Sequence, residues 1–456
     1  LNKQPAEATR TQMGWTDDYS GFIIGNDEYR KDGRIVKTAA SPLVSSIAKL
    51  LHKKGTLEGW QKAANKLLHT PGFEYHTVPL LCGFGSPLIR FTTIKGVSVG
   101  LVGRTGAAKS GSLYAGASMF GEPYDLCLSG AKDGATLNAL TQWYMGLKNI
   151  MMGLDEASNH KPEDISNLMY KVSQGKNKLR MQMSVNAVRE IEMTASCITV
   201  FTSNQSLTDK LTQYKSNPDG ELARYIEFEI VQPPLLDSEL GKEIFHSFRL
   251  NYGHAGPAFI GYIFSVGEQH IQEAVNRWAK KFTSTVGNNA SYRFYESLMS
   301  SMFAGAELAV DAGILEPFDI EKLFITLSQH IVKEKDQNIK KTDYLDVLGD
   351  FMDQHKSHTL IFKNNNVTQT PHGSLVARIE SDNHTYYVSR SELKKYLSSL
   401  HLSEKEFINT LEQSKHLVFK GKKRLSTGWS GMGILPGVQV YGFKDVTPDD
   451  NTHEQR

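Results

Sequence analysis

The segment GRTGAAKS at residues 103–110 constrains the possible folds of this 456-residue chain more than any other. It matches the phosphate-loop pattern G-x-x-x-x-G-K-[ST] at Gly103, Lys109 and Ser110, and it has Ala108 where the pattern has its second glycine. In such a loop the lysine reaches the β- and γ-phosphates, and the hydroxyl of the next residue ligates Mg²⁺. Alanine adopts a positive φ only at a cost, so Ala108 leaves the nucleotide affinity of the loop open.

The residues on both sides of this loop have the pattern that phosphate binding requires. The apolar run GVSVGLVG (96–103) predicts a buried parallel strand, and KSGSLYAGASMF (109–120) has helical spacing. A sharp turn between them would aim backbone N–H groups and a helix N-terminus at the phosphates. The alternative is an ordinary strand–helix turn with a surface lysine. The expected nucleotide contacts are Gly103, Thr105, Gly106, Ala107, Ala108, Lys109, Ser110 and Gly111.

Two adjacent acids follow a second apolar run, IMMGL at 150–154. Asp155 and Glu156 come about 45 residues after Lys109. A strand that ends in two carboxylates suits magnesium-dependent hydrolysis, because Asp155 would hold the metal together with Ser110 and Glu156 would polarise the attacking water. The alternative is a pair of acids that merely opens a loop.

Two further polar residues adjoin apolar runs. Asn204 ends the run CITVFTS, and in a parallel sheet its amide would lie near the γ-phosphate and orient water. A plain turn residue is the alternative. Arg224 precedes the run YIEFEIV (225–231), where ring-forming ATPases of the AAA+ type carry the arginine finger that reaches a neighbouring site. A surface salt bridge is the ordinary role of a single arginine.

Strands alternate with helices from residue 96 to residue 231, which predicts an α/β fold. We expect a three-layer P-loop NTPase core with a mainly parallel sheet, including a short strand at 125–128. From residue 358 the order of strand, turn, two helices, basic hairpin and strand resembles a winged helix. The expected parts are an N-terminal mixed α/β module (1–75), the P-loop ATPase core (76–235), a helical domain (236–356), a winged-helix-like domain (357–446) and a disordered tail (447–456).

Between Val78 and Ile230 the chain resembles the phage and plasmid family labelled domain of unknown function 927. The resemblance runs through the phosphate loop, TLNAL (136–140), the LDE carboxylates, MYKVSQGKNK (169–178), FTSN and ELARYIEFEI, in the family's order. It implies an ATPase related to AAA+ and superfamily 3 helicases that acts in phage-type DNA replication, often attached to primase or polymerase modules. Ala108 departs from the glycine that is usual in the family.

Two basic segments are candidates for nucleic-acid contacts. Residues 171–189 contain five basic residues and no acid, and in a ring helicase this segment would project towards the central channel. Residues 415–424 also contain five basic residues and would form the wing of a winged helix. Solvated charged hairpins are the alternative for both. The candidate phosphate contacts are Lys176, Lys178, Arg180, Lys420, Lys422, Lys423 and Arg424.

The net charge, the cysteine content and the length of the apolar stretches limit what kind of protein this chain can be. The net charge of +2 means that any nucleic-acid footprint must be local. Three widely spaced cysteines, without zinc-site spacing, favour a reducing compartment over a disulfide framework. No apolar stretch approaches ~20 residues, so we expect no membrane span and a cytoplasmic location, that of the host cell if a phage encodes the chain. Because the chain begins with Leu1, we expect it to be a fragment of a longer polypeptide.

These observations lead us to expect an ATP- and Mg²⁺-dependent helicase or translocase. It would form a ring, hexameric by preference, on single-stranded or forked DNA, with a fused or associated primase or polymerase. Two alternatives stay open. A nucleotide-gated DNA-binding or assembly module without translocation would bind ATP without turnover, whereas a P-loop phosphotransferase would ignore DNA.

Overall fold

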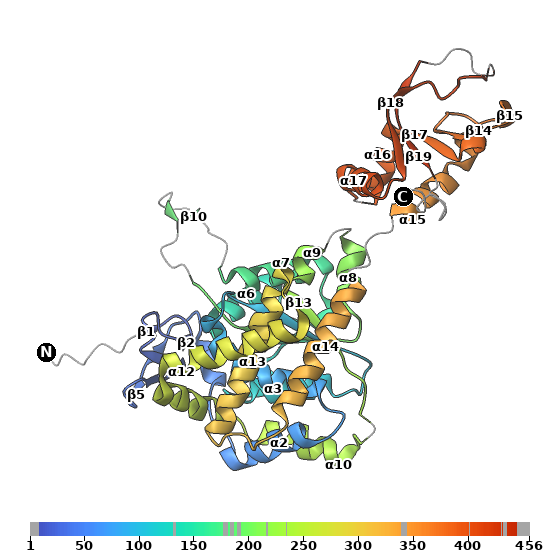
Figure 1. Ribbon diagram of the computed structural model, residues 1–456. Helices are drawn as coiled ribbons and strands as arrows, with labels where there is room; N and C mark the ends of the chain where they lie inside the picture. The colour runs from blue at the N-terminus through green and yellow to red at the C-terminus, as the bar shows by residue number, and fades with distance from the viewer. Residues whose placement is uncertain are drawn as a thin grey trace. The chain divides into compact units, whose positions relative to one another are not determined.

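The chain forms two compact units, one of residues 1–214 and 218–337 and the other of residues 215–217 and 338–456. The N-terminal module, the strands around the phosphate loop and most of the helical region therefore share one unit, and the boundary at residue 337 lies within the segment expected to be a single helical domain. The computed structural model describes residues 9–130, 134–176, 181–182, 187–188, 193–215, 218–233, 235–338, 344–400, 402–429, 431 and 436–444 (Figure 1). The expected tail at 447–456 lies outside the described residues.

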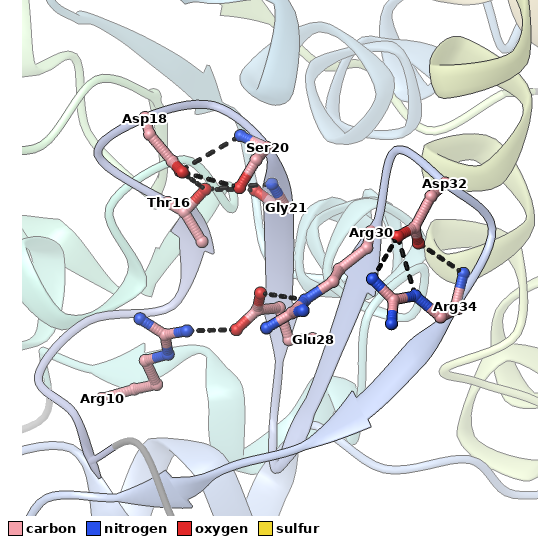
Figure 2. A network of polar contacts seen from close by, with 9 residues as sticks. All are labelled: Arg10, Thr16, Asp18, Ser20, Gly21, Glu28, Arg30, Asp32 and Arg34. Atoms are coloured by element: carbon pink, nitrogen blue, oxygen red, sulfur yellow. Dashed lines mark hydrogen bonds and ion pairs between the residues drawn. The ribbon is translucent and has the colours of Figure 1, made fainter.

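Six short strands lie within residues 9–40. They are β1 (Thr9–Arg10), β2 (Gly14–Trp15), β3 (Gly21–Ile24), β4 (Asp27–Arg30), β5 (Ile35–Lys37) and β6 (Ala39–Ala40). β2 to β5 form an antiparallel sheet in sequence order, and β1 pairs with β6. The buried carboxylate of Glu28 holds the guanidinium groups of both Arg10 and Arg30 (Figure 2). This pairing offsets the cost of burying the acid.

A five-stranded parallel sheet forms the centre of the first unit. Its strands are β7 (Val97–Val102), β8 (Leu128–Ser129), β9 (Met152–Asp155), β12 (Ile198–Ser203) and β13 (Tyr225–Glu229). Their order is β13-β7-β12-β9-β8, so β12 lies between β7 and β9 although it follows both in sequence. β7 and β12 are buried along their whole length, as expected for strands covered on both faces. The expected α/β alternation with a parallel sheet is confirmed.

Helices connect and cover these strands. They include α1 (Ser45–Leu50), α2 (Leu57–His69), α3 (Val78–Gly85), α4 (Lys109–Ala117), α5 (Pro123–Leu126), α6 (Leu137–Leu147), α7 (Pro162–Gln174), α8 (Leu207–Tyr214) and α9 (Asp219–Leu222), with short 3₁₀ turns η1 (Tyr75–Thr77) and η2 (Ser86–Phe91). α3 and α4 pack on each other and on β12, while α7 packs against β7. α4 therefore begins directly at the carboxyl end of the central strand β7.

The short strand expected at 125–128 is wrong in its position. Residues 123–126 form the helix α5, and the strand β8 comes after it. Pro123 stands in the first turn of α5, and the Glu122 carboxylate accepts a hydrogen bond of 2.6 Å from the Asp125 amide. A proline in the first turn and a capping side chain both favour a helix start.

The helical region begins with α10 (Ser238–Gly241), the π-helix η4 (Lys242–His246) and α11 (Ser247–Leu250). It continues with α12 (Ala255–Val286), α13 (Arg293–Asp311) and α14 (Ile320–Asn338). α12 is interrupted at Gly267, whose φ is +83°. α13 packs against α3 and so ties the helical region to the sheet. No helix among the described residues is long and apolar enough to cross a membrane.

The second unit has its own sheet and core. Its elements are α15 (Tyr344–Gln354), β14 (Thr359–Lys363), β15 (Asn366–Gln369), β16 (Ala377–Glu380), β17 (Thr385–Ser389), α16 (Arg390–Ser399), α17 (Glu404–Gln413), β18 (Leu417–Lys423) and β19 (Val438–Lys444). The sheet order is β15-β14-β16-β17-β19-β18, which makes β18 an edge strand. Phe351, Leu397 and Phe407 belong to the apolar core between the sheet and the helices.

Candidate functional site

The loop between β7 and α4 has two residues in the left-handed region of φ. Gly106 has a φ of +90° and Ala108 has a φ of +62°. Glycine adopts this conformation without cost, whereas an L-residue such as Ala108 is strained by roughly 1–2 kcal/mol. The crest of the loop, residues 104–106, is exposed. The first amides of α4 have no acceptor within the helix, so this strand–loop–helix has the geometry of an anion site.

Lys109 lies almost completely buried beneath this loop, with 7% of its surface exposed. Its Nζ donates hydrogen bonds to the carbonyl oxygens of Gly103 and Arg104 at 2.7 and 2.8 Å. It also lies 3.0 Å from Oδ1 of Asn204. Burial lowers the pKa of Lys109, and the nearby Asp155 carboxylate opposes that shift. The structure therefore brings Lys109 and Asn204 together, as the positions of their strands required.

Asp155 is held by three hydroxyl groups, two from α4 and one from β12. Ser110 Oγ lies 2.9 Å from Asp155 Oδ1, and the Thr202 hydroxyl donates to the same oxygen. Tyr114 Oη donates to Asp155 Oδ2 at 3.2 Å. Burial, and next the Asp155 charge, raise the pKa of Tyr114, so its hydroxyl stays a donor at neutral pH. A carboxylate and a hydroxyl oxygen side by side are a donor set that suits Mg²⁺.

Glu156 follows Asp155 directly at the end of β9, and its side chain is exposed. Its φ of +56° turns the chain sharply after β9. Its backbone N–H donates to Thr202 Oγ1 at 3.0 Å, so Thr202 contacts both acidic residues. Asn159 Nδ2 lies 3.4 Å from Glu156 Oε2. A carboxylate that is fixed at its backbone and open to solvent can accept a proton from water.

The sequence reasoning missed Thr202 and Tyr114. Thr202 stands on β12 two residues before Asn204, which follows directly after the strand, and side chains two apart along an extended chain point the same way. Tyr114 stands four residues after Ser110, and residues four apart share one face of a helix. Both spacings were visible in the sequence.

A buried histidine contacts the backbone of the loop between β7 and α4. His76, in η1, is 2% exposed, and its Nε2 lies 2.9 Å from the carbonyl oxygen of Ala107. Burial lowers the pKa of His76, so the ring is neutral at pH 7. Neutral imidazole with the proton on Nε2 donates to this carbonyl. His76 therefore fixes the loop backbone just before Ala108.

Arg224 lies at the opposite edge of the sheet from its own phosphate loop. Its carbonyl oxygen accepts a hydrogen bond from Ser98 at the amino end of β7, whereas the loop follows the carboxyl end. Its guanidinium donates to Ser173 Oγ at 2.9 Å and to the Gly220 carbonyl. It also lies over the ring of Tyr170, 4.9 Å from the centroid. In this structure Arg224 is engaged within its own chain.

The candidate nucleic-acid residues lie apart from the loop at 103–110 in sequence. Lys176 is exposed and forms an isolated β-bridge with Thr194, whereas Lys178 and Arg180 lie outside the described residues. Lys420 pairs with Glu412 at 2.6 Å, and Lys423 pairs with Glu380 at 3.3 Å. Lys422 and Arg424 are exposed.

Comparisons with known proteins agree with this architecture. Residues 1–192 match the family model described as Domain of unknown function (DUF927), a match that starts and ends earlier than the stretch from Val78 to Ile230. It includes the phosphate loop, Asp155 and Glu156, and it ends before Asn204. No curated protein matches the chain. A solved structure named "SCCmec type IV Cch - active helicase" is 14% identical, with a TM-score of 0.67, and the alignment covers 96% of this chain and 80% of that one. The chain therefore has an α/β fold similar to that of an active helicase, and its first 192 residues resemble the family of domain of unknown function 927.

Proposed function

We propose that this protein is an ATPase of the P-loop class, related to AAA+ and superfamily 3 helicases, that moves along DNA or unwinds it. One observation carries the proposal: Lys109, Ser110, Asp155 and Asn204 meet at the carboxyl edge of the parallel sheet through contacts of 2.9 and 3.0 Å. They come from three different strand ends, and Glu156 adjoins them. Ligands of parallel α/β sheets bind at this edge.

Each residue has a chemical role that its contacts support. The amides of the loop and of the first turn of α4 bind phosphate oxygens, and Lys109 contributes positive charge towards the β- and γ-phosphates. Mg²⁺ held by Ser110 and Asp155 would neutralise charge on the phosphates. Asn204 orients the attacking water and Glu156 polarises it. Thr202 fixes the positions of the two acids relative to each other, because its hydroxyl forms hydrogen bonds with the Asp155 carboxylate and the Glu156 backbone N–H.

The nucleic-acid part of the proposal rests on local basic segments. Lys176, Lys178 and Arg180 would follow the phosphates of single-stranded DNA within a ring, a hexamer by preference. Lys420, Lys422, Lys423 and Arg424 would contact DNA at or near a fork. The helicase-like fold makes nucleic acid the favoured partner, and a primase or polymerase would act on the strand that the ring exposes.

Ala108 supports a second candidate function. Its strained φ of +62° stands in the loop that must close on the phosphates. A loop that binds ATP without turning it over would make the protein a nucleotide-gated DNA-binding or assembly module. A phosphotransferase, the third class, would show turnover that DNA does not affect.

ATP binding and hydrolysis, measured with and without single-stranded DNA, test the proposal. Lys109→Ala should abolish turnover, and Glu156→Gln should bind ATP but stall hydrolysis, because an amide cannot polarise water. Lys148→Ala and Glu163→Gln are matched controls: Lys148 pairs with Asp17, and Glu163 stands in the first turn of α7, both outside the site. The native mass of the protein with nucleotide reports the ring.

The outcomes separate the candidates. Loss of turnover in both site variants, with DNA stimulation in the wild type, supports a DNA-dependent ATPase. ATP binding without turnover in the wild type points to the gated module. Turnover that is indifferent to DNA supports the phosphotransferase, and normal rates in Lys109→Ala would overturn the P-loop assignment.

A further inference from the structure

The second unit contains the elements of a winged helix in the order α15, β17, α16, α17, β18 and β19, with β14 to β16 inserted after α15. β17, β19 and β18 are antiparallel neighbours in one sheet. In helix-turn-helix proteins the second helix of the pair enters the major groove of DNA. By position this helix is α17.

The charge of α17 does not suit that role. The helix carries the acids Glu404, Glu406 and Glu412 against the single base Lys405. Glu404 is paired with Arg390 and Glu412 with Lys420, each at 2.6 Å, and the side chains of Glu406 and Glu412 are exposed. Phosphate backbones flank the major groove, so an acidic helix is repelled from it.

The basic charge lies instead on the edge strand β18. Its sequence, LVFKGKK, contains three lysines and no acid, and Arg424 follows it directly. Lys420 and Lys423 have acidic partners in Glu412 and Glu380. Lys422 and Arg424 are exposed, and within the described part of the chain neither has an ion pair. These two side chains are therefore available to phosphates.

An aromatic ring lies on the other face of the same edge strand, because Phe419 and Lys422 are three residues apart on β18 and side chains alternate along a strand. Lys423 shares the face of Phe419 and lies over the Tyr387 ring. Phe419 is 37% exposed and packs edge-to-face against Tyr387, with ring centroids 6.0 Å apart. Gly442 of β19 lies between these two rings, and a Cβ there would stand 2.8 Å from Phe419 Cβ. Because Gly442 has no side chain, the Phe419 ring can pack against the sheet there, and the rest of the ring is exposed to solvent. Exposed aromatic rings beside basic side chains are the usual platform for unpaired bases.

We propose that the second unit binds single-stranded DNA around the open edge of β18, where Phe419 stacks on a base from one face and Lys422 and Arg424 bind phosphates at the edge, and that α17 does not read the major groove. This proposal rests on the DNA-dependent function proposed above. It predicts binding that tolerates any sequence, because every base has a stacking face and no base edge is read. It also predicts a preference for single strands over duplex.

Binding of fluorescent oligonucleotides to the full chain tests this assignment. Phe419→Leu keeps an apolar cover on Gly442 but removes the aromatic face, so affinity for single-stranded DNA should fall roughly tenfold. Phe419→Trp should restore it, which a merely structural role would not require. Lys422→Ala with Arg424→Ala should lower the slope of log affinity against log salt by about 1.4, because each lost single-strand contact contributes about 0.7. Lys405→Ala removes a matched exposed charge from α17 and should change nothing.

ATP hydrolysis without DNA separates this proposal from the proposed function, because β18 supplies no residue of the nucleotide site. Normal DNA-free turnover with weakened DNA binding in the β18 variants supports the proposal. Tighter binding of duplex than of single strands, or a loss in Lys405→Ala equal to that in the β18 variants, would overturn it and assign the contact to α17. Unchanged binding in all variants would also overturn it and leave the ATPase function intact. Absence of hydrolysis in the wild type would count against the proposed function instead.

Discussion

Ser110 Oγ lies 2.9 Å from Asp155 Oδ1, although 45 positions separate the two residues in the chain. Ser110 stands in the first turn of α4 and Asp155 at the end of β9, and β12 lies between the strands that precede them. Thr202 of β12 bridges that gap by donating to the same carboxylate. The proposed magnesium site therefore depends on three parallel strands ending at one level.

Tyr114 is the residue that orients the other oxygen of this carboxylate. Tyr114→Phe removes the 3.2 Å contact to Asp155 Oδ2 and should leave the carboxylate free to turn. A hydrogen bond to a charged group contributes about 1.5–3 kcal/mol, so the Mg²⁺ concentration for half-maximal ATPase should rise roughly tenfold. ATPase rates over a Mg²⁺ titration measure this.

Tyr144→Phe is the matched control for that substitution. Tyr144 is fully buried, and its hydroxyl donates to the carbonyl of Val172 at 2.9 Å, outside the site. Tyr144→Phe should lower the thermal stability and leave unchanged the Mg²⁺ concentration for half-maximal ATPase. Equal Mg²⁺ curves for Tyr114→Phe and the wild type would show that Tyr114 does not position Asp155.

Ala108 makes a prediction about stability. Glycine at this position would relieve a strain of roughly 1–2 kcal/mol, which comes from the left-handed backbone conformation of Ala108. Glycine also makes the unfolded chain more flexible, and this reduces the gain in stability by about 0.4–1 kcal/mol. Ala108→Gly should therefore raise the free energy of unfolding by up to about 1.6 kcal/mol. Denaturant unfolding measures it. Ala107→Gly, at a position without positive φ, should lower stability, and a fall in both variants would refute the strain at Ala108.

The local parts of the site could be predicted from the sequence. GRTGAAKS, the acids after IMMGL and the asparagine after CITVFTS each stand at the end of a continuous apolar run, and such runs predict strand ends directly. The register of neighbours could not be predicted in this way. Hydrogen bonds between parallel strands leave no local mark, so the insertion of β12 between β7 and β9 became visible only in the structure.

Some features of the fold could not be predicted from the spacing of residues in the sequence, because they depend on single backbone angles or on contacts between distant segments. The break in α12 at Gly267 depends on one backbone angle, and glycines also occur in straight helices. The contacts of Arg224 depend on Tyr170 and Ser173 of another helix, which no spacing along the sequence relates to it. Pro123 follows the end of one helix and stands in the first turn of α5, and a proline is common in both places, so the residue alone does not predict α5.

His76 makes a prediction about pH. Burial lowers the pKa of His76 below its unfolded value of about 6.5, and His160 and His330 are shifted in the same direction by the same cause. Between the folded and unfolded pKa the unfolded chain binds more protons, so the free energy of unfolding falls as the pH drops through 6.5.

His76→Gln keeps a donor for the Ala107 carbonyl but cannot titrate. The loss of stability between pH 7 and pH 5 should therefore be smaller in this variant, as urea unfolding at three pH values will measure. His270→Gln, which replaces an exposed histidine of the same unit, is the control for the substitution itself. A slope in His76→Gln as steep as that of the wild type would contradict the assignment.

Substitutions at Arg224 test whether the protein forms a ring with shared nucleotide sites. Arg224 lies away from its own phosphate loop, where it could face the site of a neighbour, yet its guanidinium is bound to Ser173 and Gly220 of its own chain. An arginine supplied to a transferring phosphate can be worth ~10³–10⁵ in rate, so Arg224→Ala should nearly silence the ATPase if the residue acts in trans. Ser173→Ala loosens the internal contact but keeps the arginine, so it should retain activity.

The decisive experiment mixes two inactive variants. Lys109→Ala has a broken nucleotide site and an intact arginine, whereas Arg224→Ala has an intact site and no arginine. In a mixed ring some intact sites face intact arginines, so part of the ATPase activity should return, while each variant alone stays inactive. Co-assembly, followed by native mass, is the control. If the variants co-assemble and remain inactive, the arginine does not act between subunits. If Arg224→Ala hydrolyses ATP normally but melts at a lower temperature, its contacts with Tyr170 and Ser173 are its whole role.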